Sequence, residues 1–202
     1  MHLTQTLYLS TRAEWRTWLR KHHKTEKEIW LVYYNKQSGK RRIPYNDAVE
    51  EALCFGWIDS TQKKIDADSF AQRFTPRKPK SPWSELNKER AKKLIATKKM
   101  TKAGFAALGN ALEQPFTFPP DILKTIKADK ATWKYFRQFP ESYQRIRISF
   151  IAGARKRPEV FKKRLSYFIK MTAQNKTFGI TDLTDYTDYT EKKSNCSKTI
   201  SF

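Results

Sequence analysis

A short segment bounded by Pro115 and Pro120 divides the chain into two parts whose hydrophobic patterns differ. Before this segment, helix-like and strand-like patterns alternate. After it, apolar residues recur at spacings of three and four, which is the periodicity of amphipathic helices. A chain of 202 residues suits one domain or two small ones. We therefore expect residues 1–114 to form an α+β N-terminal unit and residues 119–175 to form a basic, helical C-terminal unit.

The N-terminal part contains start signals for two helices. Thr11 and Glu14 have the spacing of a capping box, and Pro44 favours the first turn of a second helix. Aromatic and β-branched residues predict strands, with a turn before the last of them, at residues 29–35, 57–60 and 70–75. This order predicts a small, mainly antiparallel sheet with helices on one side.

The C-terminal part is predicted to be a helical bundle. Its periodic segments lie at residues 121–128, 130–139, 143–151 and 158–172. The last segment, residues 180–202, has no apolar period, and we expect it to be a flexible polar tail.

The segment from Arg73 to Asn87 is the strongest candidate for a ligand site. Ser81 and Pro82 have the pattern of a helix start, and this helix is predicted to end near Lys99. Backbone N–H groups at a helix start favour anions, and nearby arginines strengthen that preference. The predicted ligand-binding residues are Trp57, Asp59, Arg73, Thr75, Arg77, Ser81, Trp83, Ser84, Asn87 and Arg90.

A purely structural interpretation of the same segment stays open. Ser81 caps the helix, the prolines fix a bend and Trp83 packs in the core. Arg90 falls on the inward face of the helix, where a charge needs a partner or a cleft. Glu50 or Glu51 is the partner that we expect for it.

The net charge of +21 favours polyanionic partners. Residues 119–179 contain 15 basic and 4 acidic side chains. Nucleic-acid binding through the basic C-terminal helices is therefore a second hypothesis, and a solvated basic surface is its alternative. The predicted nucleic-acid-binding residues are Arg145, Arg147, Arg155, Lys156, Lys162 and Lys163.

Enzyme chemistry has little support in this sequence. The three histidines lie within the first 23 residues, and the chain has no His-Glu-x-x-His motif, Gly-rich phosphate loop or Gly-x-Ser-x-Gly elbow. We therefore predict no catalytic residue, no metal and no cofactor. An enzyme that acts on a small anionic substrate through Asp59 is the alternative.

Several features favour a cytoplasmic protein with no integral membrane segment. The start of the chain has no apolar h-region, and the longest apolar runs, at 52–58 and 148–154, are too short to span a membrane. The two cysteines allow no disulfide framework, as is usual in a reducing compartment.

Several motifs together are similar to one known family. They are Ile29-Trp30-Leu31, Ala48 to Asp59, Arg73-Phe74-Thr75-Pro76-Arg77, Ser81-x-Trp83-Ser84-x-x-Asn87, Phe139-Pro140-x-Ser142-Tyr143 and Ala152-x-Ala154-Arg155-Lys156-x-x-Glu159. Over roughly residues 8–175 the chain resembles the YdeI/OmpD-associated (bacteriocin-protection) family. This resemblance implies a bacterial cytoplasmic protein linked to tolerance of envelope stress and antimicrobial peptides, and it supplies no established reaction. We expect a stress-associated protein that binds a small anionic ligand; its oligomeric state stays open.

Overall fold

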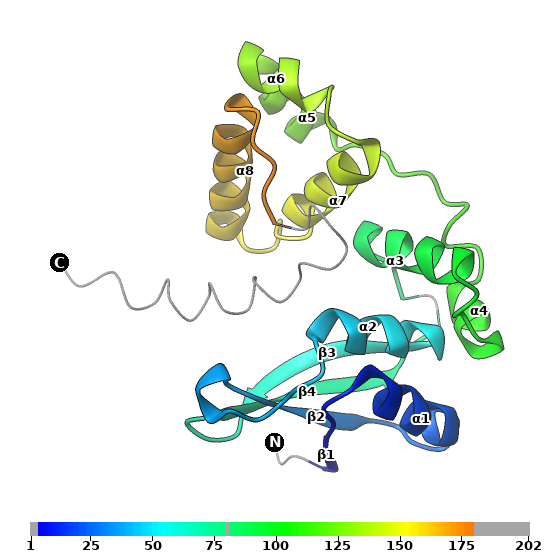
Figure 1. Cartoon of the computed structure of the whole chain (residues 1–202). Coiled ribbons are helices and arrows are strands. Elements are labelled where there is room, and N and C mark those ends of the chain that lie inside the picture. Colours follow the sequence, from blue (N-terminus) through cyan, green and yellow to red (C-terminus); the bar gives the residue numbers. More distant parts are fainter. Residues whose placement is uncertain (1–3, 80, 180–202) are drawn as a thin grey trace. The chain divides into compact units, whose positions relative to one another are not determined.

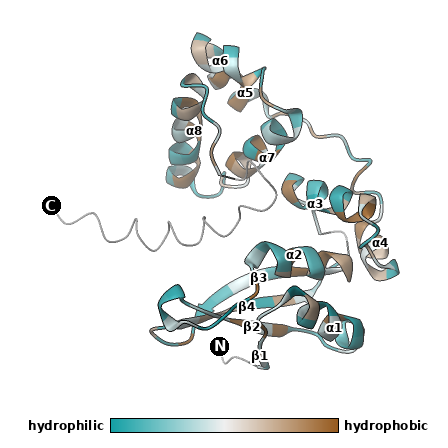
Figure 2. Ribbon diagram, in the orientation of Figure 1, coloured by the Kyte–Doolittle hydropathy of each residue, from teal (hydrophilic) through white to brown (hydrophobic). Residues whose placement is uncertain are grey.

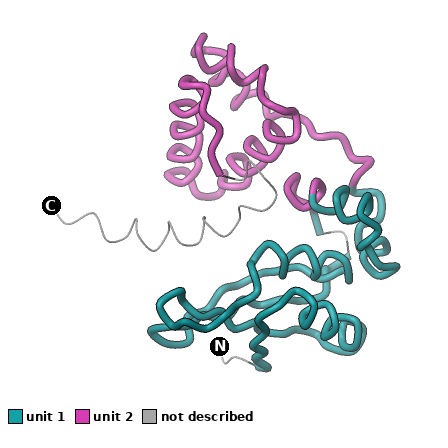
Figure 3. Tube along the Cα trace, in the orientation of Figure 1, with its two compact units in different colours: residues 1–82, 90–111, 186–202 teal, residues 83–89, 112–185 magenta. Residues whose placement is uncertain are grey.

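The computed structural model describes residues 4–79 and 81–179, which form two compact units (Figure 3). Unit 1 comprises the described residues up to 82 together with residues 90–111. Unit 2 comprises residues 83–89 and the described residues from 112 onward. The division falls within helix α3 (Glu85–Ala96). The predicted tail, residues 180–202, lies outside the described residues.

The described part of unit 1 contains a four-stranded sheet with the strand order β1-β2-β4-β3 (Figure 1). The strands are β1 (Thr6–Tyr8), β2 (Ile29–Tyr34), β3 (Trp57–Lys64) and β4 (Ser69–Pro76). β1 is parallel to β2, and the other pairs are antiparallel. The predicted mainly antiparallel sheet is confirmed. β1 was not predicted because three residues are too few to show a period of two.

The sheet register determines which side chains face the helices. Phe74 on β4 lies opposite Ile29 on β2 and opposite Asp59 on β3. Phe74 is fully buried and contacts the ring of Trp15 on α1 (Arg12–His22), with ring centroids 5.4 Å apart. Residues opposite each other on neighbouring strands point to the same face. Asp59 therefore faces the helix-covered side of the sheet.

Helices α1 and α2 (Tyr45–Cys54) begin where the sequence predicted. The Thr11 hydroxyl accepts from the Glu14 N–H, which completes the expected capping box. Pro44 is the N-cap residue of α2. The Trp15 indole donates to the Ala48 carbonyl over 3.0 Å, so that the two helices are joined through the core.

A buried ion-pair network also joins α1 to α2. Arg12 binds Glu50 over 2.8 Å and Glu51 over 2.6 Å, and Arg16 binds Glu51 over 2.6 Å. The partner expected for Arg90 was Glu50 or Glu51; the ion pairs shown for these two carboxylates are with Arg12 and Arg16. Arginines of α1 occupy both carboxylates because α1 packs directly on α2.

Helix α3 begins at Glu85, four residues after the predicted cap. The Ser84 hydroxyl accepts from the Asn87 N–H over 3.2 Å, so Ser84 takes the capping role that was predicted for Ser81. The short helix α4 (Lys102–Leu108) then returns to α2. Its Thr101 hydroxyl, at the N-cap, donates to the Cys54 carbonyl over 2.6 Å.

Unit 2 contains helices α5 (Pro120–Ala128), α6 (Lys130–Phe136), α7 (Glu141–Ala152) and α8 (Pro158–Ala173). Figure 2 shows hydrophilic and hydrophobic residues interspersed along them, as in amphipathic helices. Their buried residues form one core that includes Ile122, Ile126, Phe136, Ile148, Ile151 and Phe168. The prediction of a helical C-terminal part is confirmed. Among the described residues, no helix is long and apolar enough to cross a membrane.

Candidate functional site

Polar side chains gather in unit 1 where the start of α2 meets β3 and the end of β4. The hydroxyl of Tyr45, the first residue of α2, donates to Oδ2 of Asp59 on β3. Arg77 follows β4 directly, and its backbone N–H donates to the Gly56 carbonyl over 2.8 Å. This bond holds Arg77 beside the beginning of β3. We call Tyr33, Tyr45, Asp59 and Arg77 the Asp59 cluster.

Arg77 is a cation in a partly desolvated place. Burial lowers the pKa of its guanidinium, because removal from water disfavours the charged form, and the negative charge of Asp59 opposes this shift. Its Nη2 atom donates to the Pro82 carbonyl. The site therefore contains a positive charge whose desolvation Asp59 only partly offsets.

Tyr33 adds a buried hydroxyl to the cluster. It lies on β2, is 2% exposed and stacks on Phe70 with ring centroids 5.2 Å apart. Burial and then the charge of Asp59 raise the pKa of its phenol, while the charge of Arg42 lowers it. Among the described residues its hydroxyl has no hydrogen-bond partner. Tyr33 is thus a neutral donor held in the low-dielectric interior.

A buried pair from two helices adjoins the cluster. Arg90 on α3 is 3% exposed, and its Nη2 donates to Oδ1 of Asn46 over 2.7 Å. The Nδ2 atom of Asn46 is buried and has no partner in the part of the chain that the structure describes. Asn46 follows Tyr45 directly, so this pair and the Asp59 cluster both include a residue from the first turn of α2.

The Asp59 cluster and the Asn46–Arg90 pair together are the candidate site, and their side chains are of the kinds that bind small anions. Arg77 and Arg90 supply positive charge, and Tyr33 and Asn46 supply neutral donors. Guanidinium, hydroxyl and amide donors are the groups that bind carboxylate and phosphate oxygens. Asp59 supplies one opposing carboxylate, which is occupied by the Tyr45 hydroxyl.

The remaining residues predicted for this site have other surroundings. Trp57 is 1% exposed, and its indole donates to the His23 carbonyl over 3.1 Å. Arg73 forms an ion pair with Glu28, and Thr75 lies opposite Ile58 in the sheet. Ser81 belongs to unit 1, and its carbonyl lies 3.5 Å from Nη2 of Arg77.

Trp83, Ser84 and Asn87 belong to unit 2. Of the ten residues predicted from the sequence, the structure brings Asp59, Arg77 and Arg90 to this region. Their roles in ligand binding stay predictions.

Sequence reasoning missed Tyr33, Tyr45 and Asn46. A tyrosine in an aromatic strand is expected in the core, and an asparagine in the first turn of a helix is expected at the surface. No sequence signal indicated this burial: α2 contains Asn46, Asp47, Glu50 and Glu51, and only the structure shows that Asn46, Glu50 and Glu51 are buried. A short helix with buried polar residues must pair them with partners or with a ligand.

The six basic residues predicted to bind nucleic acid all lie in unit 2, where the three arginines have partners or are buried and the three lysines are exposed. Arg145 pairs with Glu85, Glu89 and Glu141, and Arg155 pairs with Asp121. Arg147 is 3% exposed and lies 4.3 Å from the ring centroid of Phe178, so it is a buried residue rather than a surface cation. Three exposed lysines remain, at positions 156, 162 and 163.

Within the described ranges, no group of three or more His, Cys, Asp or Glu side chains is placed to hold a metal ion. The fold and the site thus define a two-unit α+β protein with a partly buried cluster of arginine, tyrosine and amide groups.

Comparison with protein families gives each half of the chain an assignment. Residues 7–107 match a domain of unknown function (DUF8412), and residues 115–175 match the family described as bacteriocin-protection, YdeI or OmpD-associated. The chain therefore belongs to the DUF8412 family, whose match spans half of its residues, and its residues 115–175 are similar to the YdeI/OmpD-associated family. The resemblance found in the sequence is confirmed over residues 115–175, and residues 7–107 match a family of their own. No curated protein and no solved structure matches the chain.

Proposed function

We propose that unit 1 binds a small anion, such as a carboxylate or a phosphate, at the Asp59 cluster and the adjoining Asn46–Arg90 pair. The observation that carries this proposal is the presence of buried donors on Tyr33 and Asn46 that have no partner among the described residues. They lie in a region whose charged groups include two arginines. The protein acts by binding rather than by catalysis.

The energetics support an anion rather than a neutral ligand. A buried donor without a partner costs about 1–3 kcal/mol, so a ligand that accepts hydrogen bonds from Tyr33 and Asn46 recovers part of that cost. Burial disfavours the charge of Arg77, and a bound negative charge beside it favours that charge again. A cationic ligand would add repulsion to the cost of desolvation.

The description of the C-terminal family suggests a cellular role. We place the protein in a protective response to bacteriocins or antimicrobial peptides, because the matched family is described as bacteriocin-protection. The net charge of +21 opposes direct capture of a cationic peptide, since like charges repel. We infer that protection works through an anionic ligand. We place the protein in the cytoplasm, because a free thiol such as that of Cys54 is usual in a reducing compartment.

Thermal unfolding of the full chain tests the proposal. Inorganic phosphate and acetate are the probes, added at constant ionic strength so that general salt effects cancel. A ligand at about a hundred times its Kd stabilises a folded protein by about 2.7 kcal/mol, which raises Tm by several degrees. We expect at least one probe to raise Tm, and Arg77→Gln to remove most of that increase.

Arg73→Gln is the matched control, because the guanidinium of Arg73 is paired with Glu28. It removes the same charge from the same strand region. If both variants lose the ligand effect equally, the effect reflects net charge, and the site proposal is wrong. If neither variant changes it, the anion binds elsewhere.

Nucleic-acid binding is a second candidate function, and it rests on a different observation. Lys162 and Lys163 are exposed on α8, and Lys156 is exposed just before that helix. Mobile lysines at a surface are suited to neutralising phosphates along a nucleic-acid backbone. At the small-anion site, an enzyme acting on the bound anion is the alternative, and chemical change of the bound probe would favour it.

A further inference from the structure

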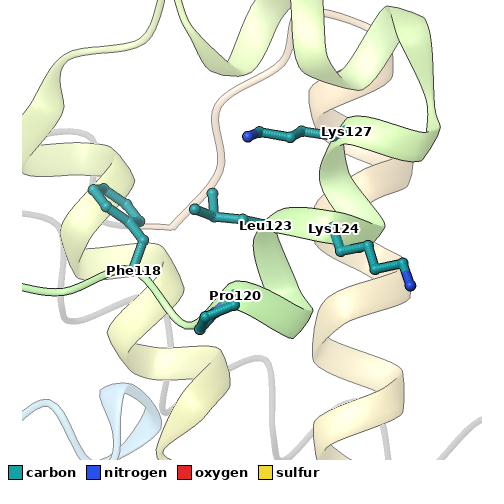
Figure 4. Close-up of a pocket in the computed structure, with 5 residues that line it drawn as sticks. All are labelled: Phe118, Pro120, Leu123, Lys124 and Lys127. Carbon is teal, nitrogen blue, oxygen red and sulfur yellow. The ribbon is translucent and has the colours of Figure 1, made fainter.

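A hollow of about 410 Å³ opens on the surface of unit 2, at the start of α5 (Figure 4). Its apolar lining consists of Phe118, Pro120 and Leu123, and its basic lining consists of Lys124 and Lys127. A volume of this size lies in the range of ligand pockets. The hollow belongs to unit 2 alone, and it is distinct from the anion site proposed for unit 1.

The apolar floor of the hollow is continuous with the core of unit 2. Phe118 and Leu123 are partly buried and pack against the core cluster. The Phe118 ring contacts Phe116 and Phe136 edge-on, with ring centroids 5.0 Å and 6.2 Å apart. The floor is therefore held by packing, and its exposed part is apolar surface that a ligand could remove from water.

The basic side of the hollow is formed by two exposed lysines. Lys124 and Lys127 are exposed, and Lys127 Nζ lies 5.2 Å from the ring centroid of Trp133. Asp121, the carboxylate in the first turn of α5, is paired with Arg155 over 2.7 Å. In Figure 4, Lys127 points to the same side as Leu123, and Lys124 points away from it. Lys127 is thus the lysine best placed to meet a group bound over the apolar floor.

We propose that this hollow binds a small amphipathic carboxylate, with an alkyl chain on the apolar floor and the carboxylate at Lys127. The apolar floor matches the alkyl chain of such a molecule, and the ammonium group of Lys127 matches its carboxylate. A phosphate is a poorer match, because the lining has no guanidinium fork to hold it. A neutral alkyl ligand would cover the apolar floor but would make no ionic interaction with the lysines.

Calorimetric titration of the full chain with octanoate tests this proposal. Octanol and acetate are the matched ligands, since the first lacks the charge and the second lacks the chain. In the Arg77→Gln background, which removes the proposed small-anion binding in unit 1, we expect saturable binding of octanoate with one site. Binding of octanol and acetate is expected to be at least about tenfold weaker, the factor that corresponds to one charge-assisted interaction. Equal binding of octanoate and octanol would overturn the role of the lysines.

Two double variants locate the site. Lys124→Gln with Lys127→Gln is expected to weaken octanoate binding by about tenfold, whereas Lys162→Gln with Lys163→Gln removes the same charge from α8 and is expected to leave it unchanged. Arg77→Gln in unit 1 is also expected to leave it unchanged, which separates this site from the small-anion site. Equal weakening by the two lysine pairs, no weakening by either, or the absence of octanoate binding to the unmodified chain would contradict the proposal.

Discussion

The side chains that define the site in unit 1 are held in the interior at a cost to stability. Tyr33 places its hydroxyl where no described residue accepts from it, and the amide nitrogen of Asn46 is in the same situation. Residues of this kind are often retained because they serve a ligand rather than the fold. Their effects on stability and on binding are therefore expected to have opposite signs.

Tyr33→Phe tests whether one buried hydroxyl has opposite effects on stability and on ligand binding. The change removes the buried hydroxyl and keeps the ring that stacks on Phe70. We expect the free energy of unfolding to rise by about 1 kcal/mol, because an unpartnered buried donor disappears. Phosphate or acetate binding, whichever is detected, should weaken in the same variant. Urea unfolding and the thermal titration measure the two effects, and a clear loss of stability would show that the hydroxyl has a structural partner.

At the scale of residues, the sequence predicts charged groups better than neutral ones. Arg77 was chosen because arginines near a helix start favour anions, and Arg90 because a charge on an inward face needs a partner or a cleft. Tyr33 and Asn46 gave no such signal, because their burial depends on sheet register and on packing between helices. Arg147 was misplaced for the reverse reason: its position in a basic run suggests a surface, whereas two aromatic rings cover it.

Among the structural elements, α2 is the one that positions the site, and close packing holds it from several sides. Helix α4 approaches the end of α2 at Gly104, where an added Cβ would lie 2.4 Å from the Cys54 carbonyl oxygen. Such a contact is far shorter than any tolerated one, so only glycine permits this approach. Gly153, the C-cap residue of α7, differs, because an added Cβ there would meet nothing nearer than 3.4 Å.

Gly104→Ala and Gly153→Ala form a matched pair. We expect Gly104→Ala to lower the free energy of unfolding by about 2–3 kcal/mol, as overpacking of a rigid interior does. Gly153→Ala should change it by less than about 1 kcal/mol, because alanine favours a helical conformation. Urea unfolding of both variants measures the difference. Similar values for the two would mean that α4 moves away from α2 at little cost.

How well elements were predicted depended on how clear their hydrophobic periods are. The longer helices of unit 2 and the hairpin of β3 and β4 show clear periods, and their predicted positions agree with the structure. β1 and α4 span three and seven residues and were missed. The start of α3 was placed too early because Ser81 and Ser84 are both favoured N-cap residues and Pro82 marked the first of them. In the structure the Ser84 hydroxyl accepts from the Asn87 N–H.

For the whole molecule, the dominant property is its charge, although much of that charge is engaged internally. In unit 2, Arg145 and Arg155 pair with carboxylates, which leaves exposed lysines as the groups most available to a polyanion. The fold class was predicted from the sequence, since alternating patterns followed by helical periods specify it. The division between two matched families was not, because motif resemblance extended across both halves.

Binding of single-stranded nucleic acid tests the role of the lysines of α8. Each phosphate contact contributes about −0.7 to the slope of log K against log salt concentration. We expect Lys162→Gln with Lys163→Gln to reduce the magnitude of the slope by about 1.4, the contribution of two contacts. Lys124→Gln with Lys127→Gln is the comparison. Equal reductions would assign binding to the overall charge of unit 2, and undetectable binding at low salt would exclude this function.

The most direct test of the small-anion site is a crystal structure of the full chain with selenate, whose anomalous signal locates the anion. We expect a peak within hydrogen-bonding distance of the Arg77 or Arg90 guanidinium, with Tyr33 or Asn46 as a further donor. The peak should disappear in Arg77→Gln crystals and persist in Arg73→Gln crystals. Selenate found only at surface lysines, or no peak in unit 1, would contradict the proposed function.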